Sequence, residues 1–133
     1  MQQYRALLKD NVSRPKPRHQ ILNDLESFIY NWKEENEDSI VILIMDVNAD
    51  STDPHLHTLL TNTSLQDVFQ HHAPYLENQS TYINGKKRID YILVSEDLLA
   101  FSEGAGHTSY DIPFISDHRG VYWDIPHNAL FNT

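Results

Sequence analysis

A chain of 133 residues with 40% hydrophobic and 11% aromatic side chains has the composition of one globular domain, which excludes wholesale disorder. The formal net charge of −9 argues against a simple nucleic-acid binder, because such proteins carry a basic surface that neutralises phosphates. There is no cysteine, hence no disulfide or thiolate metal site, and no apolar signal segment follows Met1, so we expect an intracellular protein. Residues 40–45 form the longest apolar run, which is too short to cross a membrane.

The first half of the chain predicts helices around one strand. Residues 2–8 can form a short helix, and residues 11–17 are typical of a connector. From residue 20 a helix with one buried stripe is predicted, and residues 40–45 are typical of a strand that is covered on both faces, because they are apolar without alternation. Asp53-Pro54 predicts the start of a second helix that ends near Asn62. The apolar stripe of the first helix consists of Ile21, Leu22, Leu25, Phe28, Ile29 and Trp32.

The second half predicts more strands. Residues 65–69 are apolar and of ambiguous type, and residues 81–94 predict a β-hairpin that turns at Asn84-Gly85. Ser95 is expected to cap a short helix, and two further strands are expected at residues 107–110 and 120–125. Together these elements predict a single α/β domain over residues 1–133, in which helices pack on a mixed β-sheet.

Three short motifs place polar groups at the predicted ends of strands. Asp46 and Asn48 follow the apolar strand, Asp90 lies between apolar neighbours in the second hairpin strand, and Asp117-His118 precedes the last strand. Ligands of open α/β sheets bind beyond the strand ends, and a carboxylate in an apolar strand is costly unless it is paired. Carboxylates, an amide and an imidazole at one sheet edge predict a metal-dependent phosphoryl site.

Each motif also has a structural interpretation. Asp46 and Asn48 are common in turns, Asp90 can form an ion pair with Arg88 or Lys87, and Asp117-His118 can be a capped surface loop. The remaining candidates are weaker. His55 and His57 point to different helix faces, His71-His72 lies in a polar loop, and Lys86, Lys87 and Arg88 are interpreted as solvated charges of the hairpin.

With all three motifs in this order, the chain resembles the C-terminal half of the endonuclease/exonuclease/phosphatase superfamily over roughly residues 20–125. The matching segments are Asp46-Val47-Asn48, Arg88-Ile89-Asp90-Tyr91 and Ser116-Asp117-His118. The resemblance implies half of a layered α/β sandwich that hydrolyses phosphodiesters with Mg²⁺ or Mn²⁺. It also implies that Asp46 is the general base, that Asn48 helps to orient this base and the phosphate, that His118 contacts the phosphate with Asp90 behind it, and that Asp117 binds the metal.

Nothing in this chain matches the N-terminal half of that superfamily, which supplies a metal-binding Glu. We therefore expect an exposed apolar sheet face that accepts a missing half or a second copy of the chain. Three functions remain open: an endonuclease domain fragment acting on nucleic acid, a phosphomonoesterase or inositol-phosphate phosphatase, and a non-catalytic remnant that serves as a binding or assembly module. No membrane partner is expected.

Overall fold

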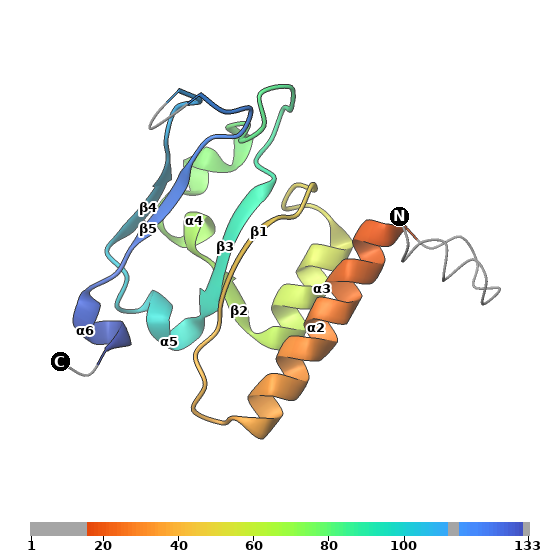
Figure 1. Cartoon of the computed structure of the whole chain (residues 1–133), viewed down its shortest axis with the longest axis vertical. Helices are drawn as coiled ribbons and strands as arrows, with labels where there is room; N and C mark the ends of the chain where they lie inside the picture. Colours follow the sequence, from red (N-terminus) through yellow and green to blue (C-terminus); the bar gives the residue numbers. More distant parts are fainter. Residues whose placement is uncertain (1–15, 112–114, 132–133) are drawn as a thin grey trace.

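The structure, a computed structural model, describes residues 16–111 and 115–131. It has a mixed α/β fold, as the sequence predicts. Three layers follow one another (Figure 1): two long helices, a three-stranded sheet, and a smaller two-stranded sheet. All strand pairs in the described residues are antiparallel, so the expected mixed sheet is instead two antiparallel sheets. The expected helix over residues 2–8 lies outside the described residues.

The first described helix, α2, spans Pro17–Glu35 and therefore begins earlier than residue 20. Pro17 fits the first helical position because a backbone N–H there has no helical partner. Only part of the predicted apolar stripe is buried. Leu22 and Ile29 lie in the core, whereas Phe28 is 65% exposed. The helix thus presents a second apolar surface that no other described element covers.

The predicted apolar strand is β1, Ile42–Asp46, and the expectation that it is covered on both faces was wrong. It is the outer strand of a sheet with the order β1-β3-β2. Leu43 and Met45 pack against the helices, while Ile42 and Ile44 on the opposite face remain exposed. The smaller sheet packs over the central strand and does not reach this edge. Continuous apolar sequence therefore marks here an edge strand with one open face.

The start of the second helix was predicted correctly. Asp53 caps α3, Pro54–Thr63, by accepting hydrogen bonds from the backbone N–H groups of His55 and Leu56. The ambiguous apolar segment divides into strand β2, Leu65–Asp67, and helix α4, Val68–His72. A 3₁₀ helix, η1, follows at Pro74–Asn78.

The predicted hairpin does not form as expected. A turn closes where Gly85 donates its N–H to the carbonyl of Tyr82. Neither Asn84 nor Gly85 takes the positive φ that a two-residue hairpin turn requires. Residues 81–83 instead lie beside residues 117–119, and the second arm becomes strand β3, Asp90–Ser95, between β1 and β2.

The remaining elements complete the third layer. The expected short helix after Ser95 is α5, although the Ser95 hydroxyl bonds to Val41 and does not cap the helix. The strand expected at residues 107–110 ends at His107 instead, and the last strand is shorter than expected. A short helix occupies the region after it. None of the helices in the described ranges is both long and apolar enough to cross a membrane. The elements are α5, Glu96–Leu99; β4, Gly104–His107; β5, Val121–Asp124; and α6, His127–Leu130.

Candidate active site

Two carboxylates face each other across the ladder of β1 and β3. Asp46 is in register with Asp90, at the end of a row in which the preceding cross-strand pairs are apolar. Val47 donates its backbone N–H to the carbonyl of Ile89, and such bonds alternate along antiparallel strands. The Asp46–Asp90 pair, one position before Val47 and Ile89, is therefore of the non-hydrogen-bonded kind, in which side chains come closest. Like charges directly opposite each other are unfavourable, so this pair needs a positive partner.

His118 supplies that partner. Its Nδ1 lies 2.9 Å from Oδ2 of Asp90, and its Nε2 lies 3.8 Å from Oδ2 of Asp46. The first distance is a hydrogen bond, whereas the second is too long for one. Both ring nitrogens thus face a carboxylate, and only Nδ1 is bonded to one. The open position at Nε2 can receive an oxygen of a third group.

The backbone that carries His118 is fixed by the segment expected to form the first hairpin arm. Ile83 donates its N–H to the carbonyl of Asp117 at 2.7 Å, and Arg119 donates to the carbonyl of Thr81 at 2.8 Å. An isolated bridge joins Tyr82 to His118, and the Tyr82 ring lies 5.2 Å from the imidazole. Strand-like pairing therefore delivers the imidazole to the end of the β1–β3 ladder.

The electrostatic environment favours the charged imidazole. The hydrogen bond that His118 Nδ1–H donates to the Asp90 carboxylate raises the pKa of His118 above its usual 6.5. Burial acts in the opposite direction, and the charges of Asp90, Asp46 and Asp117 add to the increase. The side chain of His118 is 31% exposed, so a ligand in solvent can reach it. The site combines a positively charged, oriented imidazole with an accessible carboxylate.

The turn after β1 has a local cause. Asp46 Oδ1 accepts the backbone N–H of Asn48 at 2.9 Å, and Asn48 has a φ of 55°, a left-handed conformation that Asn adopts more readily than most residues. The carbonyl of Asn48 accepts a hydrogen bond from Arg18 at 2.9 Å. The structural interpretation of this motif is thus confirmed, and it leaves Oδ2 of Asp46 facing His118.

The structure brings together three of the five residues that the sequence singled out. Ligand atoms of Asp46, Asp90 and His118 all lie within 4.8 Å of one another. Asp117 is exposed and is not part of this group, so its role as a metal ligand stays a prediction. Asn48 is exposed beside the group and contacts Asp46 through its backbone.

The chemistry of the three side chains fits a divalent cation. Mg²⁺ is bound in proteins by one or two carboxylates together with waters and substrate phosphates. Asp46 has 48% of its side chain exposed and is the carboxylate of this group that solvent reaches most readily, whereas Asp90 is bonded to His118. No second group of this kind occurs among the residues that the structure describes. The histidine pairs at residues 55/57 and 71/72 therefore remain poor candidates.

Two positioning residues had no signal in the sequence. Thr81 is fully buried, and its hydroxyl accepts the backbone N–H groups of Ile89 and Asp90 at 2.9 and 3.3 Å. Arg88, interpreted as a solvated hairpin charge, is completely buried and bonds to Asp67 and Glu77. The structural interpretation of Asp90 as a partner of Arg88 was therefore wrong at the level of side chains. Both roles depend on residues distant in the sequence.

Comparisons with known proteins add no assignment. A scan against protein-family models found no match, and a search of curated proteins found no significantly similar sequence. The function proposed below is therefore supported by the three sequence motifs and by the geometry of Asp46, Asp90 and His118.

Proposed function

We propose that this chain carries the phosphodiester-cleaving site of a metal-dependent endonuclease that acts on nucleic acid. The observation that carries the proposal is the order of Asp90, His118 and Asp46, in which one imidazole is bonded to one carboxylate and faces another. A bonded carboxylate fixes the ring orientation and stabilises the imidazolium, which is the form that attracts a phosphate oxygen.

Each residue has a distinct role in this proposal. His118 donates a hydrogen bond from Nε2 to an oxygen of the scissile phosphate, while Asp90 holds the ring through Nδ1. Asp46, the more exposed carboxylate, accepts the proton of the attacking water. The backbone N–H of Asn48 holds the Asp46 carboxylate in place. A bound Mg²⁺ or Mn²⁺ would neutralise negative charge on the phosphate.

Cleavage of supercoiled plasmid by the full chain tests the proposal. We expect cleavage that requires Mg²⁺ or Mn²⁺ and that falls by about 100-fold or more in His118→Ala and in Asp46→Ala, the scale on which a positioned acid or base contributes. The matched control is His57→Ala, because His57 is exposed on α3 and outside the site. Cleavage that persists in His118→Ala, or a metal-saturated wild type that leaves plasmid intact, contradicts the proposal.

A phosphomonoesterase is the second candidate, and the net charge of −9 favours it. A small phosphate ester does not need the extended basic groove that a long nucleic acid requires. A panel of small phosphate esters, assayed beside plasmid with the same variants, separates the two functions. Hydrolysis of the esters with intact plasmid would assign the site to small substrates.

A further inference from the structure

Strand β1 presents an unpaired edge with regularly spaced hydrogen-bonding groups. Among the residues that the structure describes, it pairs with β3 on one side only. On that side Val41 accepts the N–H of Ser95 at 3.0 Å, and Val47 donates to Ile89 at 2.9 Å. Because these bonds alternate along an antiparallel strand, the N–H and C=O groups of Ile42 and Ile44 point away from β3. The open edge can therefore accept another strand.

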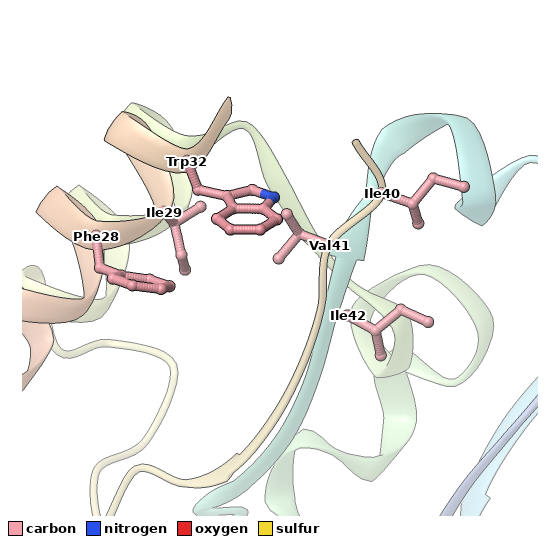
Figure 2. Close-up of a pocket in the computed structure, with 6 residues that line it drawn as sticks. All are labelled: Phe28, Ile29, Trp32, Ile40, Val41 and Ile42. Carbon is pink, nitrogen blue, oxygen red and sulfur yellow. The ribbon is translucent and has the colours of Figure 1, made fainter. Parts of the chain in front are cut away.

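Apolar side chains flank this edge on both faces. On the face toward the smaller sheet, Ile40, Ile42 and Ile44 are 50%, 40% and 66% exposed. On the helix face, Phe28 and Trp32 are 65% and 47% exposed. Figure 2 shows Trp32 directed toward Val41 from α2, while Ile40 and Ile42 point away from the helix on the other side of the strand. An open hollow of about 310 Å³ lies between α2 and residues 40–42.

Most of this edge lacks the usual protective features, and the one charged residue of β1, Asp46, lies at its end. Residues 39–45 contain no charged residue, no proline and no glycine. Edge strands of monomeric proteins commonly carry a lysine, a proline or a bulge that prevents pairing with another molecule. An uncharged, β-branched segment of this length pairs readily with an identical segment.

We propose that a second copy of this chain docks on the β1 edge and forms a symmetric dimer. In this dimer the two β1 strands pair antiparallel about a two-fold axis and join the two three-stranded sheets. β1 is the matching occupant because it is apolar on both faces and has outward-pointing backbone groups at alternate positions, which is what the edge requires. A symmetric contact of this kind uses the same surface on both copies.

Charge and area are consistent with a second copy. If Ile42 lies opposite Ile44 of the partner subunit, the two Asp46 carboxylates lie at opposite ends of the shared ladder and do not meet. At about 200 Å² for a large apolar side chain, the five half-exposed residues expose roughly 500 Å² per chain, which is the most that they can bury in the dimer. A stable interface buries about 800 Å² per partner, of which about two thirds is apolar in homodimers. The interface does not depend on the proposed metal site.

Sedimentation equilibrium of the full chain tests this proposal. We expect a species of twice the 15.5 kDa chain mass. Ile44→Lys should raise the dimer dissociation constant by about 100-fold or more, because it places two like charges in the interface. Tyr75→Lys is the control, since Tyr75 is 78% exposed on η1 and away from β1. Ile44→Thr, which keeps the β-branched side chain, provides a second variant with less effect on folding.

Hydrogen exchange locates the contact. In the dimer the backbone N–H groups of Ile42 and Ile44 should be protected, and in monomeric Ile44→Lys they should exchange rapidly. The N–H groups of Leu43 and Met45, which point toward β3, should stay protected in both. A wild type that remains monomeric at several hundred micromolar, or equal association of Ile44→Lys and Tyr75→Lys, overturns the proposal. The proposal is also overturned if the backbone N–H of Ile42 is protected equally in the monomer and in the dimer.

Discussion

His118 is bonded to one carboxylate and faces a second, and its protonation state depends on both. The contact with Asp90 at 2.9 Å raises its pKa more than the longer contact with Asp46 does. A histidine with a raised pKa is charged over more of the neutral range than a free one. The charge of the proposed catalytic imidazole is therefore set by its positioning residue.

Asp90→Asn tests this dependence directly. The substitution removes the charge and replaces a carboxylate acceptor with an amide, so we expect the pKa of His118 to fall. Asp117→Asn should lower it less, because Asp117 contributes the smallest of the increases. The measurement is an NMR titration of the His118 ring proton in buffer with EDTA. Equal pKa values in wild type and Asp90→Asn would show that the bond does not control the imidazole.

The same shift has a consequence for stability. Because the pKa of His118 is higher in the folded than in the unfolded chain, its bond with Asp90 stabilises the fold fully below the usual pKa of 6.5. That contribution is lost as pH rises through the folded-state pKa.

At the scale of elements, the start of α3 was readable because its causes are local. Asp53 and Pro54 are adjacent to the helix that they begin, and the cap bonds span two and three residues. The cap at Asp67 has the same form, with bonds to the N–H groups of Phe69 and Gln70. Such bonds need no information from the rest of the chain.

Asp53→Ala should lower the free energy of unfolding by about 1 kcal/mol through loss of the α3 cap. Asp53→Asn keeps an oxygen that can accept the same backbone bonds, so it should change stability by less than about 0.5 kcal/mol. The contacts of Arg18 and His19 with Asp53 are 3.9 Å long and contribute little in either variant. Urea unfolding followed by circular dichroism measures the difference. Equal losses in both variants would attribute the effect to the ion pairs.

The pairing of distant segments could not be read in the same way. A turn forms at Ile83-Asn84, one residue before the expected Asn84-Gly85, and its arms do not pair with each other, because residues 81–83 pair with residues 117–119. The apolar composition of β1 correctly predicted a strand. It wrongly predicted that both faces of this strand are covered, because covering a face depends on which other elements pack against it. Motif order placed Asp46, Asp90 and His118 together, while the position of Asp117 outside the group depends on loop conformation.

At the scale of the whole molecule, two apolar clusters lie on opposite faces of the three-stranded sheet. One joins the sheet to α2 and α3 and contains Tyr91, and the other joins it to α4 and the smaller sheet and contains Phe69. The guanidinium of Arg88 lies 4.2 Å from the centre of the Tyr91 ring and 5.2 Å from that of Phe69. This buried residue therefore contacts both clusters.

Arg88 also holds two carboxylates in the interior, donating to Asp67 at 2.6 Å and to Glu77 at 2.7 Å. Burial opposes its charge, but these two partners raise its pKa, so the guanidinium stays charged. Arg88→Met should reduce the free energy of unfolding by about 3–5 kcal/mol, because both carboxylates lose their partner in a poorly solvated site. The neighbouring Lys87→Met, whose side chain is 47% exposed and 3.8 Å from Asp50, should change it by less than about 1 kcal/mol. Urea unfolding monitored by both near- and far-ultraviolet circular dichroism measures these values. Equal effects of the two substitutions would show that Arg88 does not join the two halves of the core.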